Sequence, residues 1–359
     1  MAAHIRIVYA EGMATIRFGW LTAFVMGLTI GSVNGESAKK VAPTGVFYLL
    51  KSNSIEHPFN DLANDPSWTN PNVRGVSMRS QWRKIELSEG NFDWSFFDEG
   101  VRLAAQYHKK ISMSVTAGVT TPDWVYDAGA YKFTINKLRS RGGSASMTQP
   151  LPGDTVFLAK WTNFIRALAA RYDNEPDLAY VVIGGPGRRA ESFFVDSPED
   201  IAKLQSIGGL SRWVQGSEKI VDRYASTFLR TPFILATGPP IPDYTGRTAL
   251  SQLVDYGVSH YPGRFGIMSD GLRPRYEMTS PAAQMIRALS ARTPVGFQML
   301  LPSKGGRQMA PGTLADALGR GLVLGAHFLE VYSVDCNDPN QAPVLREVSA
   351  KLKAKFGSD

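Results

Sequence analysis

The sequence predicts a (β/α)8 barrel, and two observations lead to that fold. After residue 43, eight short, apolar, β-rich runs follow one another, and amphipathic helical stretches separate them. Parallel strands that are buried on both faces have this continuous apolar character. The chain has 359 residues, a length that such barrels reach as one domain. Eight strands interleaved with helices favour a closed barrel over an open sheet.

Each element is placed by its own local pattern. The expected strands are Gly45–Leu50, Val73–Met78, Lys110–Val115, Ala179–Ile183, Pro232–Ala236, Phe265–Ser269, Pro294–Leu300 and Phe328–Val334. Amphipathic helices, in which apolar residues recur every three or four positions, are expected at Phe96–His108, Val156–Tyr172, Ser217–Leu229, Ser280–Ala291 and Ala315–Gly325. Long connections, Gly118–Asp154 and Gly187–Gly216, follow the third and fourth strands and are expected to form the rim of an active site. A doubly wound sheet is the alternative fold, but the turn Gly184–Gly187 lacks the GxGxxG pattern.

The N-terminal segment has the features of an export signal. Arg17 precedes an apolar run from Phe18 to Ile30, and small residues follow that run. This order predicts a signal peptide within residues 1–36, with Met13 as the alternative start to Met1. The apolar run is short for a transmembrane span, and an uncleaved anchor is the alternative. We therefore expect a secreted or periplasmic barrel over residues 44–356, with no stable membrane insertion after processing.

Composition argues against several other classes. The net charge is +7, but the basic residues are scattered and no basic motif is present. Solvated surface charge therefore explains them better than a nucleic-acid partner does. The single cysteine, Cys336, excludes an intramolecular disulfide, and the five histidines show neither HxH nor HExxH spacing. We expect no metal and no cofactor.

A motif after the second strand resembles clan A glycoside hydrolases, in particular the family 42 β-galactosidase-like barrels. Its residues are Arg79, Trp82, Glu86, Gly90, Phe92, Trp94 and Asp98. The resemblance implies that Arg79 supports the catalytic carboxylates, since a neighbouring guanidinium keeps a carboxylate ionised and oriented. A surface ion pair is the alternative for Arg79. Glu86 and Asp98 are expected to be structural.

Three aromatic residues are predicted to line the pocket. Trp82 belongs to the motif above, and Tyr332 lies in the eighth strand. Trp124 lies in the run Gly118–Tyr126, which resembles another element of the same barrels. An aromatic face suits the C–H face of a sugar ring, so Trp124 is predicted to stack on substrate, with a core position as the alternative.

Glu191 is the predicted general acid. It follows the Gly-rich turn after the fourth strand, where clan A enzymes carry their acid/base glutamate, and the resemblance implies this role. Ala190 stands where the family often has asparagine. A glycosidase acid needs a raised pKa beside the scissile oxygen. The alternative is a solvated loop residue beside Arg188 and Arg189.

A second carboxylate is needed for glycoside hydrolysis. The resemblance places it at the end of strand seven, where this chain has Gln298, which cannot be an oxygen nucleophile. Gln298 is instead expected to bind substrate. Glu330, within the apolar eighth strand, is the predicted nucleophile or base, because a buried charge is costly without a role or a partner. A buried pair with Arg79 is the alternative for Glu330, and Asp270 and Asp335 are reserves.

Two functions from different classes fit these residues. The first is a hydrolase for a β-linked glycan or galactoside, with Glu191 and Glu330 as its carboxylates. The second is a catalytically inactive carbohydrate-binding barrel, which Gln298 favours. Both imply a carbohydrate partner, and an unrelated chemistry is a third reading because fold does not fix function. A carboxyl separation of about 5–5.5 Å would indicate retention, and about 6.5–9.5 Å inversion.

Overall fold

The structure is a computed structural model that describes residues 39–50, 62–135, 146–186, 193–303 and 312–357. The chain divides into two compact units, Met1–Glu36 and Ser37–Asp359. The described residues all belong to the second unit. The predicted signal peptide and Glu191 lie outside the described residues.

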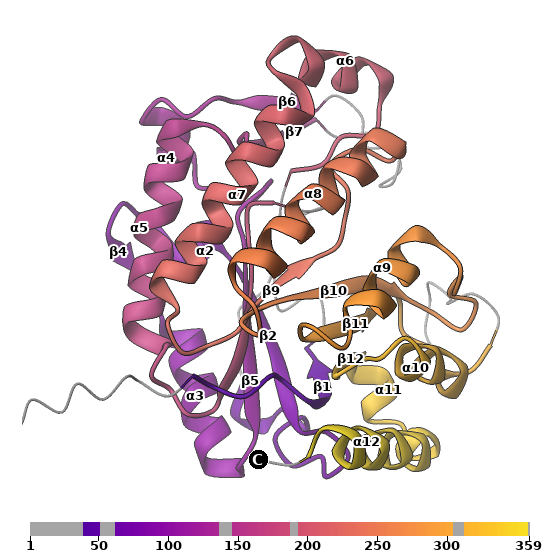
Figure 1. Cartoon of the computed structure of the whole chain (residues 1–359). Coiled ribbons are helices and arrows are strands. Elements are labelled where there is room, and N and C mark those ends of the chain that lie inside the picture. The colour runs from indigo at the N-terminus through magenta and orange to yellow at the C-terminus, as the bar shows by residue number, and fades with distance from the viewer. Residues whose placement is uncertain (1–38, 51–61, 136–145, 187–192, 304–311, 358–359) are drawn as a thin grey trace, which may run out of the picture. The chain divides into compact units, whose positions relative to one another are not determined.

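Parallel strands close into a barrel in the described part of the chain (Figure 1). They are β1 (Gly45–Leu49), β2 (Gly75–Gln81), β5 (Lys110–Thr116), β8 (Leu178–Val182), β9 (Phe233–Ala236), β10 (Phe265–Leu272), β11 (Val295–Met299) and β12 (Phe328–Tyr332). Their order around the barrel is β1-β12-β11-β10-β9-β8-β5-β2, so the first strand pairs with the last. All eight expected strands are confirmed, with ends shifted by a few residues, and the doubly wound alternative is excluded.

Helices surround the barrel and run back between consecutive strands (Figure 1). They are α3 (Ser95–Tyr107), α5 (Thr155–Tyr172), α7 (Gly209–Thr227), α8 (Tyr244–His260), α9 (Pro281–Leu289), α10 (Leu314–Val323) and α12 (Ala342–Phe356). The helix expected from Ser217 begins earlier, at Gly209, because Trp213 also packs into the core. No helix among the described residues is long and apolar enough to cross a membrane.

Short elements fill the connections at the carboxyl ends of the strands. They are α2 (Trp82–Ile85), β3 (Glu86–Ser88), β4 (Asn91–Phe92), α4 (Asp123–Asp127), β6 (Phe133–Ile135), β7 (Met147–Gln149), α6 (Pro198–Ser206) and α11 (Ser333–Cys336). Two 3-10 turns, η1 (Leu62–Asn64) and η4 (Pro339–Gln341), complete the described elements. The two long connections expected as loops therefore contain helices and a hairpin.

The barrel interior is a packed core. The rings of Phe47, Tyr180 and Phe328 meet there, with centroids 5.2 Å apart for Phe47 and Tyr180 and 4.6 Å for Tyr180 and Phe328. Glycines on neighbouring strands leave room for these rings. A Cβ at Gly296 would lie 2.1 Å from the Phe328 ring, and one at Gly75 would lie 2.6 Å from the Phe47 ring. Layers of side chains that fill the interior are typical of this fold.

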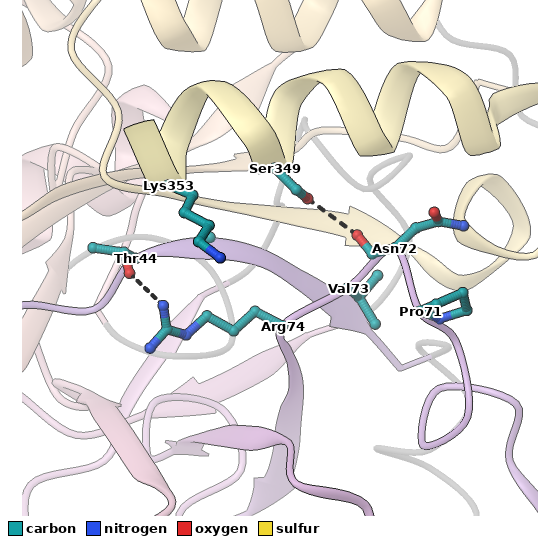
Figure 2. A pocket seen from close by; sticks show the side chains of 8 residues that line it. Thr44, Pro71, Asn72, Val73, Arg74, Ser349 and Lys353 are labelled. Carbon is teal, nitrogen blue, oxygen red and sulfur yellow. Dashed lines mark hydrogen bonds between the residues drawn. The ribbon is translucent and has the colours of Figure 1, made fainter. Parts of the chain in front are cut away.

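A small hollow of about 210 Å³ lies at the end of the barrel where the strands begin (Figure 2). Arg74 donates to Thr44 Oγ1 at 2.9 Å, and Ser349 on α12 donates to the Asn72 carbonyl at 3.2 Å. Lys353 on α12 also lines it. These contacts attach the last helix to the start of β2. Because barrels of this kind carry their active sites at the other face, this hollow is not the candidate active site.

Candidate active site

Three polar side chains from two strands converge on Glu330 of β12 inside the barrel. Its Oε1 accepts hydrogen bonds from Ser77 Oγ on β2 at 2.6 Å and from Tyr180 OH on β8 at 2.7 Å. Its Oε2 accepts from Arg79 Nη2 at 3.0 Å. Glu330 is 0% exposed. Three donors therefore satisfy a carboxylate that would be costly to bury alone.

Arg79 lies one layer above Glu330, toward the carboxyl ends of the strands. Its side chain is 15% exposed. The Nη2 atom that meets Glu330 also donates to Gln298 Oε1 on β11. Gln298 in turn donates from Nε2 to the Met299 carbonyl at 3.4 Å. The guanidinium is therefore fixed between a charged and a neutral acceptor before any ligand arrives.

The Tyr180 phenol supports this arrangement. Burial, and next the negative charge of Glu330, raise the pKa of Tyr180 well above its ordinary value. The phenol therefore stays protonated and keeps donating to Glu330. Ser112 on β5 extends the network by donating to Ser77 Oγ at 3.1 Å.

A buried hydroxyl beside Arg79 marks the floor of the barrel mouth. Ser114 on β5 is paired in register with Arg79 on β2. Its Oγ is buried and has no hydrogen-bond partner among the described residues. A buried polar atom of this kind calls for a water molecule or a ligand atom. Ser114 and Arg79 are therefore neighbours in the polar layer below the barrel mouth, and of the two only the partly exposed Arg79 has surface for a ligand.

The two reserve carboxylates differ in their surroundings. Asp335 is 0% exposed and accepts hydrogen bonds from the Ser303 backbone N–H, at 2.9 Å to Oδ2, and from the Ser303 hydroxyl. It therefore anchors the loop after β11. Asp270 is partly exposed near the carboxyl end of β10, two residues after Met268, which packs in the barrel interior. The predicted separation between Glu191 and Glu330 involves a residue outside the described ranges.

The position of Trp82 corrects one prediction. Its side chain is 0% exposed and packs against Trp161, with ring centroids 4.7 Å apart. Its Nε1 donates to Glu86 Oε2 at 2.7 Å. An indole with no exposed surface cannot line a pocket, so Trp82 is a core residue. Its motif places it there because Glu86, itself buried, supplies the acceptor that an interior tryptophan needs.

The remaining motif residues have structural contacts, as expected. Glu86 also accepts from the Gly90 N–H at 2.9 Å, and burial raises its pKa above the ordinary value. Asp98 forms an ion pair with Arg171 at 2.6 Å and accepts from Tyr172 OH at 2.8 Å. The motif therefore joins the β2 connection and α3 to α5. Arg79 is the motif residue that lies in the barrel interior.

The two other aromatic candidates are partly exposed. Trp124 on α4 donates from Nε1 to the Glu86 carbonyl at 3.3 Å and meets Trp82 edge to face at 5.8 Å. Tyr332, at the end of β12, donates to the Leu300 carbonyl at 3.3 Å. Tyr332 follows Glu330 by two positions, so strand alternation places it on the same face, nearer the mouth. Its predicted contact with substrate stays a prediction, as does that of Trp124.

Sequence reasoning missed Ser77 and Tyr180. The available signal was a polar atom within an otherwise apolar strand, the same signal that identified Glu330. Groups of three or more His, Cys, Asp or Glu that could hold a metal ion are absent from the ranges that the structure describes. The lone Cys336 is buried, and burial raises the pKa of its thiol well above the ordinary value.

Comparisons with known proteins agree with this fold. The profile of glycoside hydrolase family 42, described as β-galactosidase, matches residues 68–186, about a third of the chain. That segment runs from just before β2 to the turn after β8 and contains Arg79. No curated protein sequence gives a significant match to the chain.

Several solved structures share the barrel. The β-amylase catalytic domain of Paenibacillus polymyxa has a TM-score of 0.60 at 11% identity, over 88% of this chain and 99% of its own. The β-galactosidase of the psychrophilic Marinomonas ef1 has a TM-score of 0.55 at 10% identity, over 88% and 61%. The β-glucanase of Saccharophagus degradans has a TM-score of 0.50 at 10% identity, over 87% and 88%.

The fold is a closed (β/α)8 barrel, which the chain shares with the solved β-amylase and β-galactosidase structures. Over residues 68–186 its sequence is similar to the family 42 β-galactosidases. It spans about three fifths of the Marinomonas β-galactosidase structure. At these identities the solved structures establish the fold, and activity has to be argued from the site.

Proposed function

We propose that the chain is a secreted glycoside hydrolase that cleaves a β-linked glycan or galactoside, with Glu191 as general acid. The fixed position of Arg79 carries this proposal. Its guanidinium lies between Glu330 and Gln298 at the carboxyl ends of the strands, inside the segment similar to family 42. Catalytic groups of such barrels come from this face. A positive charge fixed there keeps loop carboxylates ionised and oriented.

We assign Glu330 to holding Arg79 rather than to attacking the sugar. It is fully buried, and its two oxygens accept from Ser77, Tyr180 and Arg79. A nucleophile must reach the anomeric carbon of a bound sugar, and a carboxylate with no exposed surface cannot. Glu330 therefore takes the alternative role considered for it from the sequence, a buried ion pair with Arg79.

Asp270 takes the role of second carboxylate in this proposal. It is partly exposed near the carboxyl end of β10, on the strand next to the one that carries Gln298. Either role in hydrolysis, nucleophile or general base, needs a carboxylate that solvent and substrate can reach. Asp270 has that exposure, whereas Glu330 and Asp335 do not.

The test uses Glu191→Gln and Asp270→Asn, with reducing-sugar release measured on a panel of β-linked glycans and galactosides. Each substitution is expected to lower kcat by about a hundredfold or more, the contribution of a positioned acid or base. Glu347→Gln on α12, which removes an exposed carboxylate, is the matched control and should leave turnover unchanged. Undiminished turnover of Glu191→Gln on a good substrate would remove Glu191 from the mechanism.

A carbohydrate-binding barrel without hydrolysis is the second candidate. The observation that favours it is Gln298, an amide beside Arg79 at the end of β11, where the resemblance implies a carboxylate nucleophile. Calorimetry with oligosaccharides separates the candidates. Saturable binding to the wild-type chain, together with no released sugar after long incubation, would support the binding protein and contradict the hydrolase.

The export part of the proposal rests on the N-terminal sequence. The apolar run from Phe18 to Ile30, after Arg17 and before small residues, supports cleavage near Gly35–Ser37. Expression of the full chain in a bacterial host, followed by N-terminal sequencing of the exported product, tests it. A mature N-terminus near Ser37 is expected, and an intact N-terminus on a membrane-bound product would instead indicate an anchor.

A further inference from the structure

A basic groove follows the outside of the barrel between α5 and α7, which run side by side (Figure 1). Two adjoining hollows, of about 440 and 380 Å³, form it and share Arg166. Its cations are Arg166 on α5, Lys219 and Arg223 on α7, and Arg230 after α7. We call this the α5/α7 groove. It shares no lining residue with the hollow of Figure 2 and includes none of the residues around Arg79 and Glu330.

The charges of α7 are segregated by face. Lys219 and Arg223, one helical turn apart, line the groove on the side of α5. The acidic residues of this helix are Glu218 and Asp222, and neither lines the groove. Asp222 accepts from Tyr256 OH at 2.8 Å and from Tyr261 OH at 2.7 Å on the side of α8, and the charge of Glu218 also acts on Tyr256. Both acids therefore lie toward α8, away from the cations in the groove.

The cations of α5 also differ between its two faces: those on the far side form ion pairs, and the one in the groove forms none among the described residues. On the other side of this helix, Lys160 pairs with Glu89 at 2.6 Å and Arg171 pairs with Asp98 at 2.6 Å. Arg166, in the groove, donates to the neutral Asn163 at 3.4 Å. In the described part of the chain, Arg166 forms no ion pair with a carboxylate, and neither do Lys219 and Arg223.

The one carboxylate that lines the described groove is already occupied. Asp173 is 7% exposed. It accepts from the backbone N–H groups of Arg230, at 3.1 Å, and of Thr231, at 2.8 Å. Its charge is therefore used to fix the turn after α7. The groove presents a net positive surface to solvent.

We propose that the α5/α7 groove binds a linear anionic polysaccharide, a chain of uronate or sulfated sugars. Lys219 and Arg223 are separated by about 6 Å along the helix axis, so they can contact acidic groups along one chain. The groove also presents the amides of Asn163 and Asn174 and the hydroxyl of Thr227 for sugar hydroxyls. The choice of a polysaccharide rests on the proposed function of the barrel.

The composition of the groove favours a glycan over a nucleic acid. Aromatic side chains are absent from the described lining of both hollows, so unpaired bases would find no stacking platform. Leu229, 58% exposed at one end, offers an apolar contact for the face of a sugar ring. Thr155, the first residue of α5, lines the other end. Because helices of this barrel start near the carboxyl face of the sheet, a bound chain can extend toward the mouth that holds Arg79.

The experiment measures binding of polygalacturonate to the full chain by calorimetry at low and moderate salt. The test variant is Arg166→Gln/Arg223→Gln. The matched control, Arg287→Gln/Arg346→Gln, removes the same charge from exposed positions on α9 and α12. We expect saturable, salt-sensitive binding that the control retains and that the test variant weakens about tenfold. Neutral galactan, duplex DNA and vesicles of anionic phospholipid are the comparison ligands.

Equal affinities of the test variant and the control for polygalacturonate would overturn the proposal, as would absence of saturable binding. Tighter binding of DNA or of anionic vesicles than of polygalacturonate, lost in the test variant, would overturn the choice of a polysaccharide. The proposed catalysis is tested separately with Glu191→Gln. That variant should bind polygalacturonate at the groove like the wild type whether or not it hydrolyses glycans.

Discussion

Arg79 on β2 and Glu330 on β12 form an ion pair inside the barrel, with 3.0 Å between Nη2 and Oε2. The two strands are far apart in sequence, and both neighbour β1 in the closed sheet. The pair therefore exists only when the last strand has closed the barrel against the first. Since Gln298 and Glu330 share the guanidinium, barrel closure also fixes the charge at the mouth. Such preorganisation avoids the cost of reorienting the group when substrate binds.

Glu330→Gln is expected to destabilise the fold by about 3–5 kcal/mol, because it leaves Arg79 in the barrel without its counter-charge. The amide also cannot accept equally well from Ser77 and Tyr180, which both donate to Oε1. Urea unfolding followed by circular dichroism measures the change. Glu347→Gln, which breaks an exposed pair with Lys351, is the control and should leave the midpoint unchanged. A loss below about 1 kcal/mol in Glu330→Gln would contradict this account of the pair.

Trp82→Phe should lower stability by about 1–3 kcal/mol without changing oligosaccharide affinity. The substitution removes the Nε1 donor to Glu86 and leaves a buried carboxylate oxygen without that partner. Thermal unfolding and calorimetric titration with the best glycan ligand measure the two effects. Unchanged stability together with an about tenfold loss of oligosaccharide affinity would show instead that Trp82 contacts the substrate.

The strands of the barrel were predictable because their apolar runs leave a clear pattern in the sequence. The helix α8 was not predicted, because two glycines interrupt its helical pattern. Gly246 and Gly257 lower the helix propensity of its sequence. Packing requires both: a Cβ at Gly246 would lie 2.2 Å from the Ile241 carbonyl oxygen, and one at Gly257 would lie 2.5 Å from the Phe265 ring. Tertiary contacts therefore decide this helix against its local preference.

The candidate site was predictable only in part. The cost of burying a charge identified Glu330 and its pairing with Arg79 among the alternatives. Sequence could not decide between a core position and a pocket position for Trp82, because an indole suits both. The deciding fact was the buried Glu86 acceptor next to it. Such a pairing depends on the three-dimensional path of the β2 connection.

His327 should make stability depend on pH. Its Nδ1 accepts from the Val295 N–H at 3.2 Å, and its ring stacks on Phe356 with centroids 4.1 Å apart. Burial, and next the charge of Lys355, lower the pKa of His327 to about 4. The folded state thus binds the proton less tightly than the unfolded chain, whose histidine has a pKa near 6.5. The stability that neutral His327 contributes is complete above pH 6.5 and is lost as pH falls toward 4.

We expect the free energy of unfolding to fall by about 2–3 kcal/mol over that pH window from this residue alone. Urea titrations of the wild type and of His327→Gln at pH 7, 5.5 and 4 measure it. The difference between the two proteins should shrink steadily as pH falls. His260→Gln, at an exposed position on α8, is the control. A constant difference across the three pH values would show that His327 does not titrate in this range.

The last prediction concerns Gln298, the neutral neighbour of Arg79. A glutamate side chain at position 298 has nearly the same shape as glutamine. Its carboxylate would accept a charge-assisted hydrogen bond from Arg79 Nη2. It would also place a carboxylate at the end of β11, where the resemblance to clan A implies the nucleophile. Hydrolysis lost in Asp270→Asn should therefore recover by about tenfold or more in Asp270→Asn/Gln298→Glu.

Reducing-sugar release by the single and double variants, with Asp270→Asn/Gln298→Asn as control, tests this recovery. The control shortens the side chain and keeps it neutral, so it should stay as slow as Asp270→Asn. If wild-type hydrolysis is absent from the start, Gln298→Glu alone should create it, because the missing carboxylate would then be the cause of inactivity. Equal rates in all of these variants would mean that position 298 does not face the reacting bond, and that Arg79 holds Gln298 for packing alone.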